Sequence, residues 1–137
     1  MGREIELPTI VVPVGGVSRI TAIAVALADR LTADVRTVYC AAEAADTTRM
    51  RAEWARLYPG RGLVILPSPY RSIVEPLRQY VRDLRREQAG RPVVLVVPEV
   101  VPRQWWQHAL HNQTALFLKG AVLFEPGVYV LSVPYRL

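Results

Sequence analysis

Short apolar runs and longer stretches with helical spacing alternate along the whole chain. Five runs have the length and composition of strands, at residues 9–14, 34–40, 63–66, 92–97 and 128–133. Between them, apolar residues recur every three or four positions, which predicts helices over 18–31, 43–58, 71–87 and 102–124. The first and fourth runs are apolar almost throughout, as is typical of parallel strands that are buried on both faces.

Five strands alternating with four helices predict an α/β fold, with a parallel sheet and helices on both faces. Right-handed crossovers favour the strand order 3-2-1-4-5, and 137 residues fit one domain over 1–137. In that order the winding reverses between strands one and four, and ligands of such sheets bind beyond the carboxyl ends of the strands there. The predicted site therefore combines residues 13–19 and 98–103, with 67–71 reaching in from the side.

The segment TIVVPVGGVSR supplies the first candidate binding residues. A buried strand ends in a glycine turn, and a serine then begins a helix, so free backbone N–H groups and a helix dipole are available to an anion. The spacing is not G-x-G-x-x-G, so the turn indicates an α/β domain more strongly than a phosphate site. The candidate residues are Pro13, Gly15, Gly16, Ser18 and Arg19.

The segment PSPYRSIVEP at 67–76 supplies two more candidates. Arg71 offers a forked donor for phosphate, and Tyr70 offers a ring for a base. The same residues also suit a rigid helix start with a packed Tyr70 and a solvent-facing Arg71. Both interpretations stay open.

A polar tetrad, His111-Asn112-Gln113-Thr114, precedes the apolar stretch from residue 115. We take His111, Asn112 and Gln113 as candidate ligand contacts, while the alternative is that they cap strand ends. Earlier in the same segment, Trp105 and Trp106 are adjacent and cannot both face the core of one helix. One of them is expected to cover a neighbouring surface or subunit.

The sequence gives little support for a metal site or a catalytic site. His108 and His111 are three residues apart on the predicted helix, but the carboxylate of Glu99 is distant and no cysteine is nearby, so no metal site is predicted. No P-loop, catalytic triad spacing or cysteine–histidine pairing occurs. The chain is therefore predicted not to be an enzyme.

Composition narrows the class of partner. Apolar residues make up 51% and charged residues 21%, with a net charge of +5, and all but one of the 17 basic residues are arginine. A stripe of arginines along 71–85 is interpreted mainly as a solvated face, and nothing indicates nucleic-acid recognition. The apolar run 115–124, broken by Lys119, is shorter than the ~20 residues of a membrane span. A lone cysteine, Cys40, suits a reducing cytoplasm.

The segments VVPVGGVSR, SPYRSIVEPL, VVPEVVPRQWWQHALHNQTA and GVYVLSVPYRL are spread over nearly the whole chain, from residue 11 to residue 137. They resemble the universal stress protein-like cytosolic tail of some permeases in the amino acid–polyamine–organocation superfamily, which includes KUP-type potassium importers. The resemblance implies a homodimeric regulatory domain at the inner face of the cell membrane, attached to a permease. It also implies cyclic di-AMP as a ligand, with Gly15, Gly16, Ser18 and Arg71 as donors.

Stress proteins that bind ATP carry G-x2-G-x9-G-[ST] after the fourth strand, whereas residues 97–114 contain no glycine here. ATP is therefore a less suitable ligand than a dinucleotide with fewer, differently placed phosphates. Two alternatives remain. One is an interaction module that binds no nucleotide and holds a dimer together, and the other is a free-standing, ATP-binding stress protein.

Overall fold

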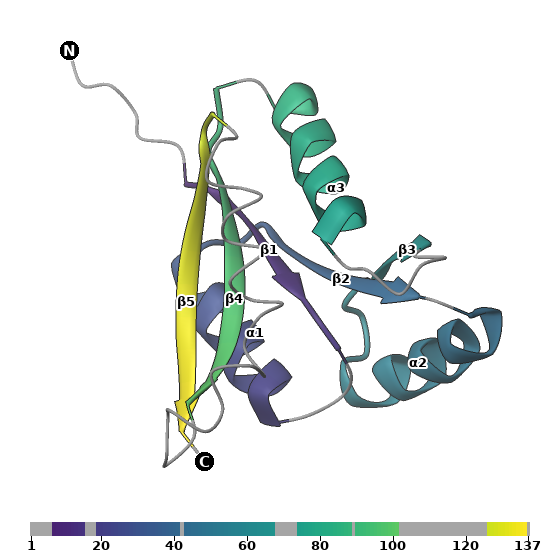
Figure 1. Ribbon diagram of the computed structural model, residues 1–137. Helices are drawn as coiled ribbons and strands as arrows, with labels where there is room; N and C mark the ends of the chain where they lie inside the picture. Colours follow the sequence, from purple (N-terminus) through teal and green to yellow (C-terminus); the bar gives the residue numbers. More distant parts are fainter. Residues whose placement is uncertain are drawn as a thin grey trace.

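The structure is a computed structural model that describes residues 7–15, 19–41, 43–67, 74–88, 90–101 and 126–136. Strands and helices alternate through most of this part of the chain (Figure 1). In chain order the elements are β1 (Thr9–Pro13), α1 (Arg19–Leu31), β2 (Val35–Ala41), α2 (Ala44–Leu57), β3 (Val64–Pro67), α3 (Val74–Glu87), β4 (Val93–Val101) and β5 (Val128–Arg136).

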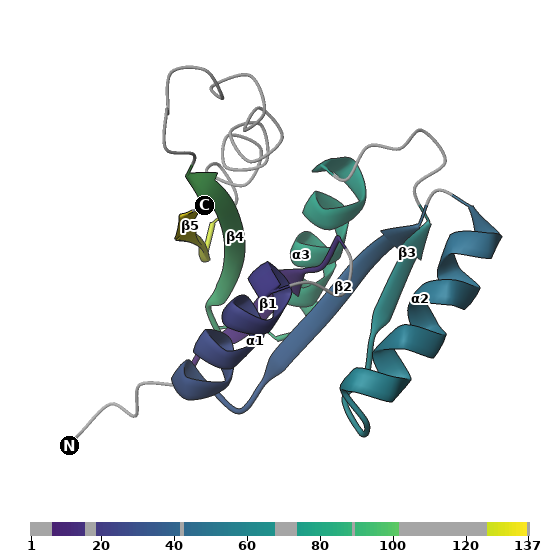
Figure 2. The ribbon, with the colours of Figure 1, turned by 90° about the horizontal axis from the view of Figure 1, so that it is seen from below.

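The five strands form one parallel sheet in the order β3-β2-β1-β4-β5. This confirms the predicted fold class and strand order. β1 is central, with Ile10 opposite Val35 of β2 and Val94 of β4. Helices α1 and α2 lie on one face of the sheet and α3 on the other (Figure 2), as right-handed crossovers require.

Each face of the sheet has its own hydrophobic core. Successive strand residues point to opposite faces, so Val11 packs under α3 while Ile10 and Val12 pack under α1. The α3-side core includes Leu77 and Val81, both fully buried. The apolar spacing of 71–87 predicts that Ile73, Val74, Leu77, Tyr80, Val81 and Leu84 face inward. Leu77, Val81 and Leu84 are buried as predicted, Tyr80 packs at the edge of this core, and the side chains of Ile73 and Val74 lie outside the description.

The helix boundaries agree closely with the apolar spacing. α1 and α2 begin and end within a residue of the predicted limits, and α2 stops at Tyr58, whose N–H donates to the Trp54 carbonyl at 2.7 Å. Gly60 follows with φ +84°, a conformation that favours glycine. Trp54 is buried, its indole N–H donates to the Arg61 carbonyl at 3.0 Å, and its ring stacks on that of Tyr58. These contacts hold the turn after α2, so the helix ends where the pattern predicts.

β4 and β5 are longer than predicted. Residues 98–101 were expected in a loop, but they continue β4 and pair with 133–136 of β5. Because β1 ends at Pro13, the last four residues of β4 extend beyond it by ~13 Å. The predicted loop at 98–103 is therefore wrong over 98–101, where the chain is strand.

Residues 102–124, predicted to be mostly helical, lie outside the described residues, as do Trp105, Trp106 and His108. Among the helices that the structure describes, none combines the length and the apolar character that crossing a membrane requires.

Candidate functional site

Part of the predicted site lies at the carboxyl end of β1, as the topology requires. Pro13 ends the strand, and the next residue, Val14, donates its N–H to the Val38 carbonyl at 2.8 Å. Gly15 is exposed just beyond, and Arg19 is exposed at the first position of α1. Strand end, turn and helix start thus occur in the predicted order, with Gly16 and Ser18 outside the described residues.

Neither the backbone conformation at residue 15 nor the packing around it requires a glycine there. Its φ lies outside the left-handed region, and a Cβ placed on it would meet nothing within 4 Å. By contrast, Gly60, Gly90 and Gly127 all have positive φ. Gly15 therefore leaves its backbone open to close approach from outside.

A cavity of about 250 Å³ opens beside Gly15. Tyr39, near the carboxyl end of β2, lines it together with one face of α2. The α2 residues recur at helical spacing, so their side chains point the same way: Asp46, Arg49, Met50 and Glu53. Typical ligand pockets hold ~300–1,000 Å³, so this cavity fits one ring or headgroup of a larger ligand.

The charged side chains around the cavity are available to a ligand. None of the hydrogen bonds or ion pairs between described residues involves the side chains of Asp46, Arg49 or Glu53. The two carboxylates outnumber the guanidinium, so an amino group that donates hydrogen bonds suits the cavity better than a bare anion does. The N-terminus of α1 follows Gly15 closely in the chain. Its partial positive charge suits the anionic part of a ligand.

The other predicted contacts cannot be placed. Tyr70, Arg71, His111, Asn112 and Gln113 lie outside the described residues. Sequence reasoning missed Tyr39 and the α2 residues. A signal was present, because a helix that follows a parallel strand begins at the carboxyl edge of the sheet. The spacing 46-49-53 puts three charged residues on one side there.

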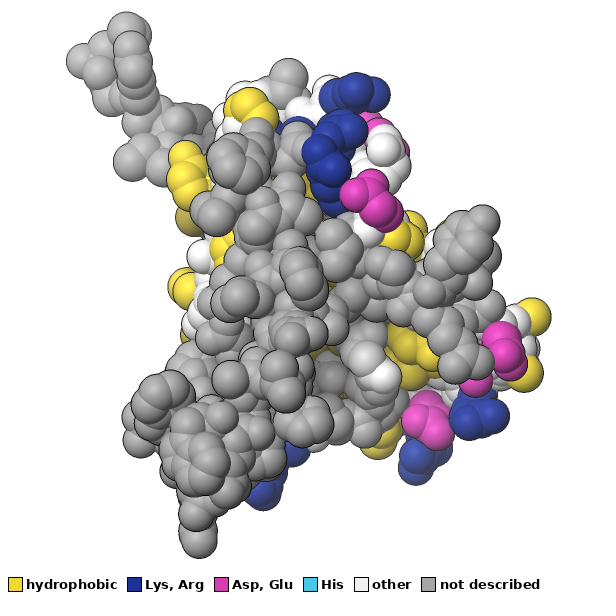
Figure 3. Space-filling view, in the orientation of Figure 1, with side chains coloured by type: hydrophobic (Ala, Val, Ile, Leu, Met, Phe, Trp, Pro, Cys, Tyr) yellow, Lys and Arg dark blue, Asp and Glu magenta, His cyan; other side chains and the backbone are white. Residues whose placement is uncertain are grey.

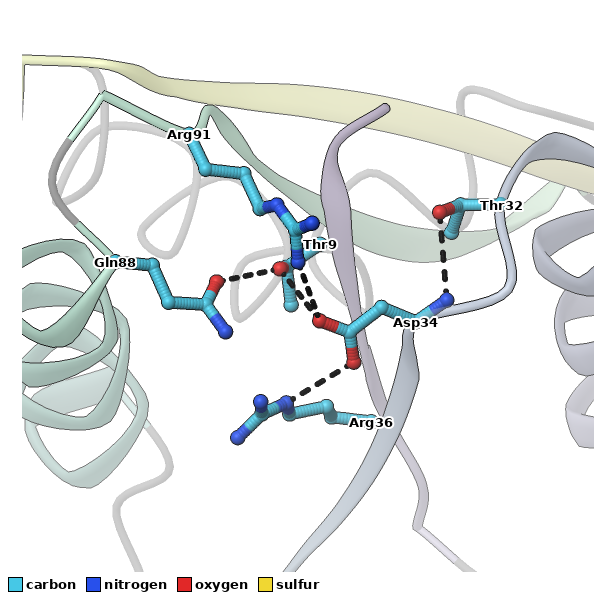
Figure 4. A network of polar contacts seen from close by, with 6 residues as sticks. All are labelled: Thr9, Thr32, Asp34, Arg36, Gln88 and Arg91. Carbon is cyan, nitrogen blue, oxygen red and sulfur yellow. Dashed lines mark hydrogen bonds and ion pairs between the residues drawn. The ribbon is translucent and has the colours of Figure 1, made fainter. Parts of the chain in front are cut away.

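The opposite, amino edge of the sheet carries a connected polar network (Figure 4). The Thr9 hydroxyl lies 2.9 Å from Asp34 Oδ2 and 2.6 Å from Gln88 Oε1, and its single proton serves one acceptor at a time. Arg91 donates to Asp34 Oδ2 at 3.2 Å, and Arg36 donates to Asp34 Oδ1 at 3.3 Å. These contacts join the starts of β1 and β2 to the end of α3.

The protonation of this network follows from its contacts. Partial burial works to raise the pKa of the Asp34 carboxyl, but hydrogen bonds from Thr9 and Arg36 and the charge of Arg36 outweigh it and lower the pKa below its usual value. Burial likewise works to lower the pKa of Arg36, and its hydrogen bonds to Tyr80 and Asp34 raise it overall. Both groups are held in their charged forms.

Arg85 of α3 forms a second contact at this edge. Its guanidinium donates to the carbonyl of Pro126 at 3.1 Å and to the carbonyl of Arg91, which fixes the starts of β5 and β4. Gly127, with φ +77°, lies directly under that guanidinium, and a Cβ there would collide with it. Arg85 is thus not part of a solvated stripe as predicted, because it binds two backbone carbonyls.

The rest of the arginine stripe is mixed with acidic residues, and Figure 3 shows both charges side by side over α3. Arg78 pairs with Glu75 at 3.3 Å. Such exposed pairs stabilise a fold by only ~0.2–1 kcal/mol. This surface therefore offers no concentrated positive field.

The part of the chain that the structure describes contains no group of three or more potential metal-binding side chains. The free thiol of Cys40 is half-buried on β2, and desolvation raises its pKa to about 11. At neutral pH this thiol is protonated and therefore a poor nucleophile.

Comparison with known proteins agrees with a domain attached to a transporter. The family model of the KimA potassium transporter C-terminal domain matches residues 6–135. The chain is also 27% identical over 138 residues to the potassium transporter KimA of Bacillus subtilis (strain 168). That match covers 98% of this chain and 22% of the relative, so the chain spans about a fifth of the length of the curated relative that it matches.

Proposed function

The chain belongs to the KimA potassium transporter C-terminal domain family, and from this membership we propose that it regulates a longer membrane potassium transporter from the cytoplasmic face. The observation that carries the proposal is the family match over residues 6–135, almost the whole chain. The matched relative is a potassium transporter, and the match covers 22% of it, so this chain would form the smaller part of a similar transporter. The proposed role is binding and coupling, without catalysis.

The proposed ligand is an adenine nucleotide, cyclic di-AMP, bound at the carboxyl edge of the sheet. Tyr39 offers an aromatic surface beside the cavity, and Asp46 and Glu53 offer acceptors for the amino group of a purine. Gly15 leaves room for the ligand to approach the backbone. The phosphates would bind toward the α1 N-terminus, with Gly16, Ser18, Arg19 and Arg71 as donors.

The size of the cavity suggests how a dinucleotide would bind. About 250 Å³ suits one base, so the second base needs an equivalent cavity. A homodimer supplies one, since a two-fold symmetric dinucleotide matches the axis of an isologous dimer. A ligand that binds one dimer arrangement more tightly than another would shift a tethered transporter between states.

Cyclic di-AMP is preferred to ATP because residues 97–114 contain no glycine. A triphosphate needs a flexible loop whose N–H groups surround it, and glycines make that close approach possible. A cyclic dinucleotide has one phosphate per base and therefore needs fewer backbone N–H donors around it. His111, Asn112 and Gln113, predicted beside this region, remain candidate contacts for it.

Titration calorimetry of the purified chain against cyclic di-AMP, ATP and AMP tests the proposal. We expect saturable binding of cyclic di-AMP at one per dimer. Arg71→Ala should weaken it about tenfold or more, the typical effect of losing a charge-assisted hydrogen bond. Arg51→Ala is the matched control, because Arg51 is exposed on α2 and points away from the cavity.

Two results would contradict the proposal. A folded dimer that gives no heat with any of the three nucleotides would leave a module that only holds subunits together. ATP hydrolysis by the purified chain would instead favour the free-standing stress protein.

A further inference from the structure

Helix α1 carries two apolar stripes, and only one of them is buried against the sheet. Thr21, Ala24, Val25 and Ala28 form the buried stripe. The second stripe runs along one flank of the helix, where Ile23 is 42% exposed and Leu31 is 46% exposed, with Leu27 half-buried between them. A helix that only covers a sheet needs a single apolar stripe, so the second one requires its own explanation.

The second stripe faces the β5 side of the molecule. On the other flank of α1, Asp29 pairs with Arg61, which precedes β3, so that flank points toward the β3 edge. At ~100° per residue, Leu27 lies about 160° around the helix from Asp29. The stripe therefore points toward the opposite edge of the sheet.

β5 extends this apolar surface. Leu131 and Val133 pack at the border of the core beneath α1, and Tyr129, two residues before Leu131, points to the same face and is 62% exposed. Hydrophobic side chains are visible along this edge in Figure 3. We define the α1–β5 face as the surface formed by Ile23, Leu27, Leu31, Tyr129, Leu131 and Val133.

The α1–β5 face has the dimensions of a helix position. Strands are ~4.8 Å apart and packed helices ~10 Å apart, so one helix covers about two strands. On this side of the sheet α2 lies toward β3, and α1 lies over β1 and also packs against β4 (Figure 2). The next helix position therefore centres on β5, and among the described elements no helix packs there beside α1. Of the described helices, the crossover rule assigns α1 and α2 to this side and α3 to the other. The stripe from Ile23 to Leu31 is ~12 Å long, a little more than two helical turns.

We propose that an amphipathic helix from the membrane-transporter part of the same protein docks on the α1–β5 face, which rests on the proposed attachment to a transporter. The match covers 22% of the curated relative, so a transporter of that length has enough chain outside this domain to supply the helix. Arg19 and Arg30 are exposed on the solvent side of the stripe, so acidic residues are expected along the outer edge of the docked helix. A second copy of this chain would present the same vacant position, and each helix of its described residues already packs on its own sheet.

Cysteine accessibility tests the docking directly. Cys40→Ala variants carrying Ile23→Cys or Ala22→Cys are labelled with a maleimide, both as the 137-residue chain and in the full-length transporter. Ala22 is the matched control, because it is exposed on the Asp29 flank of the same helix. We expect Ile23→Cys to react about tenfold more slowly in the full-length protein, as for a protected site, and Ala22→Cys to be unchanged.

A charge on the face should release the helix. Adding Ile23→Glu to a Leu31→Cys variant should restore fast labelling of Cys at position 31 in the full-length protein. Ile23 is already partly exposed, so the domain should keep its melting temperature. Equal labelling of Ile23→Cys in both proteins would overturn the docking proposal.

The remaining outcomes separate the alternatives. Labelling of Ile23→Cys that slows as the concentration of the 137-residue chain rises would identify a second copy as the occupant and overturn the helix. Cyclic di-AMP titrations of the same variants test the proposed function independently. If Ile23→Cys is protected in the full-length protein but cyclic di-AMP does not bind, the docked helix is supported and the proposed ligand is contradicted. If cyclic di-AMP binds but Ile23→Cys is not protected, the ligand is supported and the docked helix is contradicted.

Discussion

The two edges of the sheet differ in how their polar side chains are used. At the amino edge, Asp34 accepts hydrogen bonds from Arg36 and Arg91, and Arg85 donates to two carbonyls. At the carboxyl edge, the hydrogen bonds and ion pairs between described residues leave out Asp46, Arg49 and Glu53, which line a cavity. Partnered groups hold the strands together, whereas unpartnered groups around a cavity are available to a ligand.

The comparison predicts that substitutions at the amino edge reduce stability, whereas those around the cavity affect binding alone. The cavity lies at the edge where parallel sheets generally bind ligands, which is why the proposed ligand is placed there. Charged residues are present at both edges, so their number does not distinguish a structural edge from a binding edge. What distinguishes the edges is whether their charges have partners within the fold.

Gly127→Ala should have the largest effect on stability. The left-handed φ of +77° costs alanine ~1–2 kcal/mol, and the new Cβ displaces the Arg85 guanidinium, whose lost hydrogen bonds cost a further ~1–2 kcal/mol. Urea unfolding measures the sum. Gly60→Ala is the matched control, because its φ is +84° and an added Cβ meets nothing within 4 Å.

A double-mutant cycle isolates the Arg85 contribution. In an Arg85→Ala background, Gly127→Ala should cost only as much as Gly60→Ala, since the guanidinium is no longer in the way. An unchanged cost in that background would mean that Arg85 does not hold the turn before β5.

Asp34→Asn should have the next largest effect, a loss of ~1–2 kcal/mol at pH 7. The carboxylate is about one-third exposed, so screening reduces the value of its ion pairs. The pKa of Asp34 is lowered in the fold, so its contribution is complete above the ordinary value of 3.8 and is lost as pH falls through the lower folded pKa.

The difference in unfolding free energy between the native chain and Asp34→Asn should therefore narrow as pH falls below the ordinary value of 3.8, as measured by urea unfolding. Thr32→Ala serves as a control at the same turn, because its hydroxyl accepts only the Asp34 backbone N–H and should show no such pH dependence. A constant difference across that range would mean that the Asp34 charge contributes nothing.

The parts of the fold that were predictable depend on local pattern. The continuous apolar run at 92–97 predicted a doubly buried strand, and Val93, Leu95 and Val96 are fully buried. The crossover rule then fixed the strand order. The ends of β4 and β5 were missed because Pro98 and Pro134 resemble strand breakers. Both are tolerated, since β4 beyond β1 and β5 at the edge each have a side on which no other described strand pairs, so a missing N–H there breaks no described ladder.

The site was predictable only in outline. The reversal of winding pointed to the turn at Gly15, which the structure places beside a cavity. The α2 side of that cavity depends on how α2 is rotated over β2, which periodicity does not give. The amino-edge network joins Thr9 to Gln88, 79 positions apart, and no local signal indicates such a pair. The contacts of Arg85 were missed because its partners are backbone carbonyls in loops, one of them 41 positions away.

Arg49→Ala should have the smallest effect on stability and the most informative effect on binding. Arg49 is exposed and makes no ion pair within the described residues, so the unfolding free energy should change by less than ~0.5 kcal/mol. Cyclic di-AMP affinity should fall about fivefold, because a guanidinium at the cavity rim is lost. Arg51→Ala, two residues away on the opposite side of α2, should change neither quantity. A loss of stability above ~1 kcal/mol in Arg49→Ala would mean that this edge is also structural, because the guanidinium would then have a partner within the fold.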